Sequence, residues 1–349
     1  MLARRIGIEA LAQQKYAVAR NTGRLLIRLR DYRYGSELMS VAMRELAPPC
    51  PLPEWDGFDM PNGTLLVISR NQHVGAVLRL ARLLPLAAER AKHCIALVEP
   101  RLVPLFHRSF PRVDVREAGQ ADTEAYEAAD VIASYETLAR YLGVKDDGRV
   151  TELPTFQPDR DRVADFRRKY HSGKMLVGIC WHSTNEKKDL PSLKDWSAYL
   201  SRVEATYVSI QYGDRRDDLA KLRSWSGHKI IHDETVDSLT NLDTFAAQIA
   251  ALDAIVTISN TGAHMAGALN IPMFVVLDNV DQLLWPFIGR DCDWYPSTSL
   301  YQKENRPWSD IFAELETDFR ARFAIERNSY WRQKLRNFAA HLLPRQHQE

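Results

Sequence analysis

A short polar turn near residue 260 carries the residue types that bind phosphate. It consists of Ser259, Asn260, Thr261 and Gly262, and His264 follows within one helical turn. Thr261 and His264 are three residues apart, so a hydroxyl and an imidazole would share one face of a helix. The turn follows a predicted strand and opens a predicted helix, where free backbone N–H groups and the helix dipole favour an anion. The alternative interpretation is an ordinary strand-to-helix turn with a capping Ser or Asn.

The segments around this turn predict a strand–helix–strand unit. Apolar runs at Ala254–Ile258 and Met273–Leu277 have the length and composition of buried strands, and Ala263–Leu269 between them predicts a helix. Such a unit is typical of a parallel sheet that is covered by helices, and its crossover should be right-handed.

The chain as a whole predicts two sets of alternating strands and helices, of which the second ends with this unit, and further helices at both ends. Residues 1–46 predict helices with breaks at 21–23 and 34–36, and the Pro- and Gly-rich residues 48–63 and 151–163 predict linkers. The first α/β set should begin with a strand at Leu65–Ile68, and the second with a strand at 175–180. The remaining expected elements are a helix at 78–91, strands at 94–100, 113–119, 130–135, 206–212 and 229–232, helices at 102–110, 193–203, 217–225 and 244–252, and two helices within 308–343.

The composition excludes several classes of protein. The chain has 349 residues, of which 45% are hydrophobic and 26% are charged, as in a globular protein of one large or two medium domains. A formal net charge of +1 disfavours nucleic acid as a partner. The four scattered cysteines form no CxxC motif, which favours reduced thiols in the cytoplasm over a disulfide framework or a zinc site. We find neither an apolar run of the roughly 18–20 residues that a membrane span needs nor a signal peptide.

Several segments, taken in order, resemble the glycosyltransferase-like region of bacterial tetratricopeptide-repeat proteins. That region is similar to the heptosyltransferases of glycosyltransferase family nine. The resemblance covers roughly residues 24–320, and its matching pieces are LLIRLRDYRYG, PEWDG, GTLLVIS, LARLLPL, VGICWHS, YVSIQYGD, LDTFAAQIAALDAIVTISNTGAHMAGALNIP and DWYPSTSLYQ.

The resemblance implies an α/β fold of the GT-B type, in which two Rossmann-like domains face a cleft. It places a repeat-like helical segment at 1–47, an acceptor-side domain at 60–155, a nucleotide-sugar-binding domain at 165–305 and C-terminal helices at 306–349. It also implies an inverting, metal-independent transfer of a sugar from a nucleotide-diphosphate sugar to a glycan or protein acceptor. No cofactor is expected, and the N-terminal helices are a possible contact for a protein partner.

The resemblance assigns the donor-binding residues to three loops of the second domain. The first is the turn from Ser259 to Gly262 with His264, in which Ser259 stands where the family usually has an aspartate. The second loop holds His182 and Ser183 and a lysine pair, Lys187 and Lys188, which would neutralise the leaving diphosphate. The third holds Gln211 and Tyr212, which would contact the nucleoside. The alternative interpretations are that His264 only makes hydrogen bonds to nearby backbone and that the lysine pair is only solvated.

The first domain departs from the family at the expected catalytic base. Ala76 occupies the place of the aspartate that deprotonates the acceptor, and general acid–base help is worth ~100–10,000-fold. His73 lies in the same loop and is the best substitute, because histidine is the side chain most suited to proton transfer at physiological pH. An arginine that the family commonly has near Trp285 is also missing from 281–286. The alternative function is therefore a catalytically degenerate module that binds a nucleotide sugar or a protein, whereas the absence of GxGxxG disfavours a Rossmann oxidoreductase.

Overall fold

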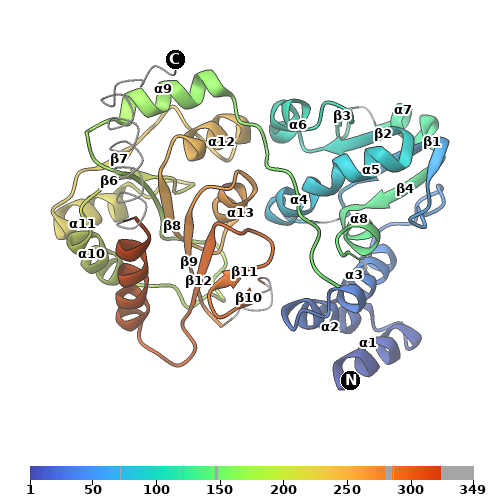
Figure 1. Ribbon diagram of the computed structural model, residues 1–349, viewed down its shortest axis with the longest axis horizontal. Helices are drawn as coiled ribbons and strands as arrows, with labels where there is room; N and C mark the ends of the chain where they lie inside the picture. Colours follow the sequence, from blue (N-terminus) through green and yellow to red (C-terminus); the bar gives the residue numbers. More distant parts are fainter. Residues whose placement is uncertain (71, 121, 146–147, 280–284, 286, 324–349) are drawn as a thin grey trace, which may run out of the picture.

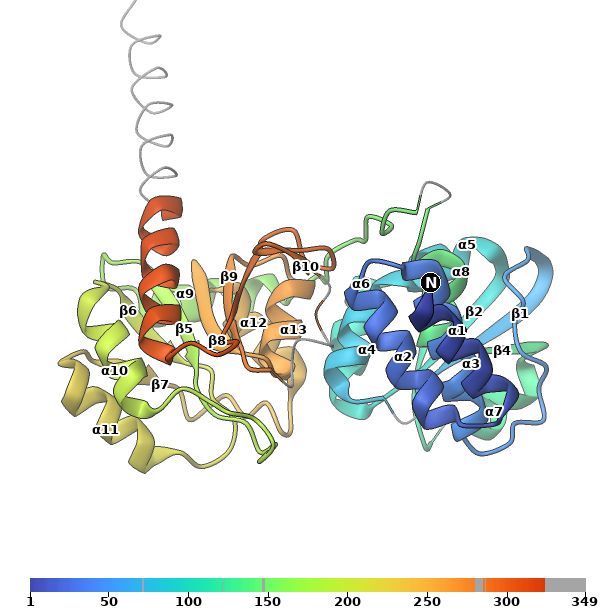
Figure 2. The same ribbon diagram turned by 90° about the horizontal axis from the view of Figure 1, so that it is seen from below.

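The computed structural model describes residues 1–349 except 71, 121, 146–147, 280–284, 286 and 324–349. The fold is mixed α/β, and its two sheets lie side by side in both views (Figures 1 and 2). Three N-terminal helices pack beside the first sheet, where α3 contacts α8. These helices are α1 (Leu2–Ala12), α2 (Tyr16–Arg28) and α3 (Tyr32–Leu46).

The first sheet has four parallel strands in the order β3-β2-β1-β4. They are β1 (Met60–Ile68), β2 (Ala91–Val98), β3 (Asp114–Glu117) and β4 (Val131–Ser134). The chain lays β2 and β3 on one side of β1 and then returns to lay β4 on the other, so the strand order reverses at the β1/β4 pair. The helices of this part are α4 (Val74–Leu80), η1 (Ala81–Leu83), α5 (Leu84–Arg90), η2 (Pro100–Leu102), α6 (Val103–Ser109), α7 (Asp122–Ala128) and α8 (Tyr135–Leu142).

The second sheet has the order β10-β11-β12-β9-β8-β5-β6-β7, and only the β10–β11 and β11–β12 pairs are antiparallel. Its strand order reverses between β5 and β8, and ligands in such sheets bind outside the carboxyl ends of the strands at that point. The strands are β5 (Leu176–Cys180), β6 (Thr206–Ser209), β7 (Ile230–His232), β8 (Ala254–Ile258), β9 (Met273–Leu277), β10 (Phe287–Ile288), β11 (Asp291–Cys292) and β12 (Thr298–Gln302). The helices are α9 (Arg160–Tyr170), α10 (Leu193–Arg202), α11 (Arg216–Ser226), α12 (Leu242–Ala250) and α13 (Thr261–Ala268), and residues 308–323 are also helical.

Both faces of each sheet are buried. In β1, Leu65 and Val67 pack into one apolar cluster and Leu66 into another, because successive side chains of a strand point to opposite faces. The cluster that holds Leu65 also holds Val275 and Leu277 of β9, so one apolar interior joins the two sheets. The continuous apolar runs of the strands are explained by this double coverage.

The predicted breaks in the N-terminal helices are wrong. Residues 21–23 lie inside α2 and 34–36 inside α3. A Cβ on Gly23 would come 2.9 Å from the carbonyl oxygen of Gly35, so these glycines permit close packing of two helices rather than a turn. The helices end instead near Gln14 and Arg30, which adopt left-handed backbone conformations with φ of 56° and 63°.

Several other predicted elements differ from the structure. The helix expected at 78–91 is divided into α4, η1 and α5, with Pro85 in the first turn of α5, because proline cannot supply an interior helical N–H. Strand β1 begins at Met60, inside the expected linker. Helices α7 and α8 and strand β12 were not predicted as such. The strands predicted at Ala254–Ile258 and Met273–Leu277 are confirmed as β8 and β9, and the second tail helix lies outside the described residues.

Candidate functional site

The turn after β8 is held by a capped helix terminus. Asn260 is the N-cap of α13, and its Oδ1 accepts a hydrogen bond from the Ala263 N–H at 3.0 Å. Its Nδ2 donates to Sγ of Cys180 at 2.9 Å, which ties the end of β8 to the end of β5. The N–H groups of Thr261 and Gly262 lie in the first helical turn, where no helical carbonyl can accept from them. The turn therefore presents donors at the strand-order reversal of the second sheet.

Ser259 and Lys188 connect this turn to its neighbours. The buried Ser259 hydroxyl accepts a hydrogen bond from Nε1 of Trp285 at 3.0 Å, so it is engaged with the protein. Nζ of Lys188 donates to the Ser259 carbonyl at 2.6 Å, whereas the neighbouring Lys187 is exposed. Of the predicted lysine pair, the structure thus brings Lys188 to the turn and leaves Lys187 in solvent.

His264 is enclosed by aromatic rings on the second turn of α13. Its imidazole stacks on Trp285 with ring centres 4.8 Å apart and an interplanar angle of 7°, and its Nδ1 lies 3.1 Å from the Tyr295 hydroxyl. Burial, together with the charges of Arg79 and Lys188, lowers the pKa of His264 to about 3. Burial raises the pKa of Tyr295, so its hydroxyl keeps its proton. His264 is therefore neutral at physiological pH, and Tyr295 can donate to its Nδ1.

The loop after β5 is organised by the buried side chain of Gln211. Its Oε1 accepts hydrogen bonds from the backbone N–H groups of Trp181 and His182, at 3.1 and 2.8 Å, and from Sγ of Cys180 at 3.1 Å. Its Nε2 donates to the carbonyls of His182 and Tyr212. Gln211 thus supports this loop, and its side-chain oxygen accepts three hydrogen bonds from it. Its contact with a nucleoside stays a prediction.

His182, Ser183 and Tyr212 lie around the same loop. Nε2 of His182 contacts the Arg215 guanidinium, and burial together with that charge lowers the pKa of His182. The hydroxyl of Ser183 accepts from the N–H of Asn185, and the hydroxyl of Tyr212 accepts from the N–H of Thr184 at 2.9 Å. These three side chains are partly exposed and shape the loop at the carboxyl end of β5.

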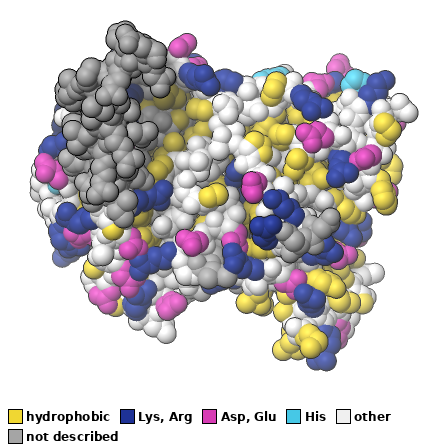
Figure 3. All heavy atoms as spheres, in the orientation of Figure 1, with side chains coloured by type: hydrophobic (Ala, Val, Ile, Leu, Met, Phe, Trp, Pro, Cys, Tyr) yellow, Lys and Arg dark blue, Asp and Glu magenta, His cyan; other side chains and the backbone are white. Residues whose placement is uncertain are grey.

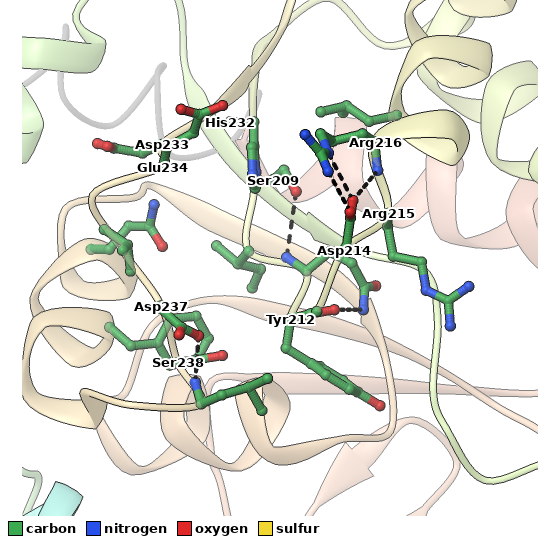
Figure 4. A pocket seen from close by; sticks show the side chains of 18 of the residues that line it. Ser209, Tyr212, Asp214, Arg215, Arg216, His232, Asp233, Glu234, Asp237 and Ser238 are labelled. Carbon is green, nitrogen blue, oxygen red and sulfur yellow. Dashed lines mark hydrogen bonds and ion pairs between the residues drawn. The ribbon is translucent and has the colours of Figure 1, made fainter.

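A cavity of about 500 Å³ opens beside this loop, at the carboxyl ends of β6 and β7. Figure 4 shows Asp237 and Ser238 on one side of it and Arg215 and Arg216 on the other. Its remaining wall residues include apolar side chains between these charged groups, among them Ile210, Leu219, Leu239 and Phe245. The cavity thus combines apolar walls with polar and charged groups, as small-molecule sites commonly do.

The cavity and the α13 turn are adjacent. An ideal Cβ on Gly262 would lie 3.5 Å from Cζ of Phe245 and 3.9 Å from Cδ1 of Ile210, and both of these residues line the cavity. A ligand that filled the cavity could therefore extend directly to the first-turn N–H groups of α13.

A polar network fixes the segment after β7 that forms one wall of the cavity. The Asp233 carboxylate, 5% exposed, accepts hydrogen bonds from the Tyr170 hydroxyl at 2.6 Å, from Lys169 and from Thr235. Burial opposes ionisation of Asp233, but these donors together hold its pKa down at about 2. The sequence-based interpretation missed this wall. The polar run HDETVDS begins at the end of a predicted strand, where ligands of such sheets bind, and this position could have revealed the wall.

The first sheet contributes little polar chemistry at the corresponding place. His73 is the exposed N-cap residue of α4 and makes no side-chain capping bond, and Ala76 is partly buried in the first turn. Gly75 packs directly against His264, because a Cβ there would lie 2.5 Å from Cδ2 of the imidazole. The structure thus brings α4 onto α13 through a glycine, and it leaves His73 at the surface. Asn71 and the segment 280–284 lie outside the described residues.

Polar contacts join the two sheets on either side of this glycine. The Arg82 guanidinium donates to the carbonyls of Pro154, Leu153 and Trp294 at 2.7, 2.8 and 3.0 Å. Arg108 of α6 pairs with Asp243 of α12, and Asn241 is the N-cap of that helix. The bonds to Trp294 and Asp243 thus hold η1 and α6 against the second α/β part of the chain.

Within the described part of the chain, no group of three or more His, Cys, Asp or Glu side chains is placed to hold a metal ion. Over the same residues, every helix is too short or too polar to cross a membrane.

Comparisons with known proteins place this geometry in context. No protein-family model matches the sequence. The chain is 27% identical over 299 residues to protein FlbA of Caulobacter vibrioides, and the match covers 78% of this chain and 49% of FlbA. The chain thus spans about half the length of that curated relative.

Two solved structures are similar to this one in fold. A glycosyl transferase family 9 protein of Veillonella parvula aligns with a TM-score of 0.50 and 12% identity over 70% of this chain and 86% of that protein. The ADP-heptose lipopolysaccharide heptosyltransferase II of E. coli aligns with a TM-score of 0.44 and 17% identity over 62% and 85%. The alignment with the Veillonella protein shows that the two chains share a mixed α/β fold with parallel sheets.

Proposed function

We propose that this chain binds a nucleoside-diphosphate sugar and transfers the sugar to an acceptor without a metal ion. One observation carries the proposal: the donor-rich first turn of α13 is adjacent to a cavity of about 500 Å³ at the ends of neighbouring strands. The likeness in fold to a family 9 glycosyltransferase supports it. The GT-B arrangement of two domains around a substrate cleft is part of this proposal.

The nucleoside would occupy the cavity, and the diphosphate would lie at the α13 turn. Apolar walls such as Phe245 would pack on the base, and the Asp237 carboxylate would accept hydrogen bonds from ribose hydroxyls. The first-turn N–H groups and the helix dipole would hold the phosphates, with Lys188 as the neighbouring cation. In the tautomer that carries the ring proton on Nε2, the Tyr295 hydroxyl donates to Nδ1 of His264, and Nε2 can donate to a phosphate oxygen.

Transfer would follow from this placement. The acceptor oxygen attacks the anomeric carbon, the bond from that carbon to the diphosphate oxygen breaks, and inversion results from attack opposite the leaving group. Lys188 and the helix terminus stabilise the negative charge on the departing diphosphate. The acceptor proton passes to a base, and His73, exposed at the start of α4, is the proposed acceptor of that proton.

A second candidate is a module that binds a nucleotide sugar or a protein without transfer. Ala76 favours it, since this side chain cannot accept a proton where the family has its base. Incubation with a panel of nucleotide sugars, followed by detection of released nucleoside diphosphate, separates the two candidates. Release that falls at least tenfold in His73→Ala supports transfer with His73 as base. Saturable binding without release from any donor supports the module.

We propose that the acceptor is a protein or a glycan and that the N-terminal helices contact a protein partner. Figure 3 shows apolar side chains over these helices, and the exposed ones include Leu2, Ile6, Ile8 and Leu29. The closely packed α2–α3 hairpin also fits a repeat-like segment. The free thiols of Cys50, Cys94, Cys180 and Cys292 fit a reducing compartment such as the cytoplasm.

A further inference from the structure

One contact between the two α/β parts of the chain reaches the wall of the cavity. Arg101 lies in η2, directly after β2 of the first part. Its Nη1 donates to the backbone carbonyls of Ser238 at 3.2 Å and of Leu239 at 2.8 Å. Both of these residues line the cavity. A side chain of the first part therefore holds backbone of the second part at the place proposed for the nucleoside.

The Arg101 guanidinium is oriented by its own part of the chain. Its Nε donates to the carboxylate of Glu99, and the side chain is only 25% exposed. Helix η2 packs against α12, and its Leu102 belongs to the same apolar cluster as Phe245 of α12, which lines the cavity. Because the ion pair and this packing restrict Arg101, its Nη1 is held in place beside the cavity wall.

The two carbonyls belong to a turn at residues 237–241, which we call the Asp237 turn. The Asp237 carbonyl accepts from the N–H groups of Thr240 and Asn241 at 3.2 and 2.9 Å. Its Oδ1 accepts from the Leu239 N–H at 2.8 Å, and the Thr240 hydroxyl donates to its Oδ2 at 3.2 Å. A carboxylate has about four acceptor positions, so Asp237 can also accept from a ligand. Figure 4 shows Asp237 and Ser238 together at the cavity wall.

Most of the Asp237 turn is exposed to solvent. Asp237, Leu239 and Thr240 are all exposed, and Leu239 is 54% exposed. Segments with few buried contacts open locally at a low cost in free energy. Hydrogen bonds from a charged guanidinium are stronger than those between neutral groups. The two bonds from Arg101 should therefore favour the ordered turn, in which Asp237 lines the cavity.

We propose that Arg101 is a positioning residue for nucleotide binding, which holds the Asp237 turn so that the Asp237 carboxylate is placed for the ribose hydroxyls. The presence of a nucleoside in this cavity rests on the proposed function. The hold of Arg101 on the turn rests on its hydrogen bonds alone. Nucleotide affinity then depends on the contact between the two α/β parts.

The first arm of the test examines the turn without nucleotide. Amide hydrogen exchange of the full chain is compared for wild type, Arg101→Met and Arg112→Met. Arg112 is 70% exposed in the same part, so its variant is a control that removes the same charge. We expect the amides of residues 239–241 to exchange at least about fivefold faster in Arg101→Met, and to keep the wild-type rate in Arg112→Met. Equal rates in all three proteins would overturn the hold on the turn.

The second arm measures affinity by calorimetric titration with ADP, UDP and GDP. Arg101→Met should weaken binding of the nucleotide that wild type binds most tightly by roughly fivefold, and Arg112→Met should not. Arg101→Lys should bind within about twofold of wild type, because its ammonium group can still donate to both carbonyls.

A double variant shows whether Arg101 acts through Asp237. Asp237→Asn keeps a side-chain oxygen for the turn but loses the charge that the ribose hydroxyls would meet. In the Asp237→Asn background, Arg101→Met should have little further effect on affinity. Additive losses would instead mean that Arg101 supports the fold in general.

The two arms separate failure of this role from failure of the proposed function. If none of the three nucleoside diphosphates binds while exchange of the turn still depends on Arg101, the proposed function fails and the hold on the turn stands. If a nucleotide binds wild type and Arg101→Met with equal affinity, the positioning role is overturned and the proposed function stands.

Discussion

The two strand-order reversals of this molecule differ in the side-chain hydrogen bonds that their loops make. At the β5/β8 reversal, Gln211, Asn260 and Lys188 link three loops through side-chain hydrogen bonds of 2.6–3.1 Å. At the β1/β4 reversal, the loop that leads to α4 offers an exposed His73 and an alanine at position 76. The second sheet thus has a hydrogen-bonded polar turn, where we propose that a ligand binds, whereas the first contributes close packing through Gly75. Binding and chemistry should therefore respond separately to mutation.

The difference extends to the buried titratable groups. His264 beside the second reversal has a pKa lowered to about 3, and Glu136 beside the first has a pKa raised to about 7. Both are held toward their neutral forms by burial, but their effects on stability have opposite signs as the pH changes.

The largest effect should come from Gly75→Ala, which breaks the contact between the two regions. The added methyl group would overlap the His264 ring at 2.5 Å, so we expect a loss of about 1–3 kcal/mol in the free energy of unfolding and weaker nucleotide binding. Urea unfolding measures the loss. In the double variant Gly75→Ala/His264→Ala, the cost of the added methyl group should be smaller. If the losses in the free energy of unfolding of the two single variants simply add, the clash lies elsewhere.

Lys188→Met should show that nucleotide binding depends on Lys188 and not on the exposed Lys187 next to it. Removing the ammonium group that donates to the Ser259 carbonyl should weaken binding of a nucleoside diphosphate roughly tenfold, since charge-assisted hydrogen bonds to phosphate are strong. Lys187→Met is the matched control, because Lys187 is exposed. Calorimetric titration of both variants measures the effect, and equal losses would assign it to net charge alone.

Asn260→Ala should lower stability by about 1 kcal/mol through the lost cap and should also weaken nucleotide binding. Asn241→Ala removes an equivalent cap from α12, where Asn241 accepts from the Thr244 N–H at 2.9 Å. The two variants should be destabilised alike in chemical unfolding. Only Asn260→Ala should bind the nucleotide less tightly. Unchanged nucleotide binding by that variant would contradict a phosphate-binding site at α13.

The smallest effect is on the pH dependence of stability. A lowered histidine pKa means that the unfolded state binds more protons, so the contribution of neutral His264 is complete above pH 6.5 and declines as the pH falls toward about 3. The raised pKa of Glu136 acts in the opposite sense, because its contribution is complete below about pH 4.5 and declines as the pH rises to about 7. His264→Gln and Glu136→Gln should therefore shift the urea midpoint curve between pH 4.5 and 6.5 in opposite directions. A shared direction would show that these two groups do not set the profile.

The sequence was most informative where buried strands determine the pattern. The apolar runs of β8 and β9 predicted both strands, because a doubly covered parallel strand tolerates little else. Helix ends were less predictable, since Gln14 and Arg30 adopt left-handed conformations with no glycine to mark them. The roles of Gln211 and of the segment after β7 depend on which strands are neighbours. That information is not local in the sequence, so the support for the loop and the cavity wall emerged only from the structure.

The central claim is that the α13 turn and the adjacent cavity together bind a nucleoside diphosphate. Calorimetric titration of the full chain with ADP, UDP and GDP, repeated with Asn260→Ala and Asn241→Ala, tests it most directly. We predict saturable binding of at least one of the three at one site per chain, weakened by Asn260→Ala and retained by Asn241→Ala. Absence of binding by all three, or equal binding by both variants, would contradict the account.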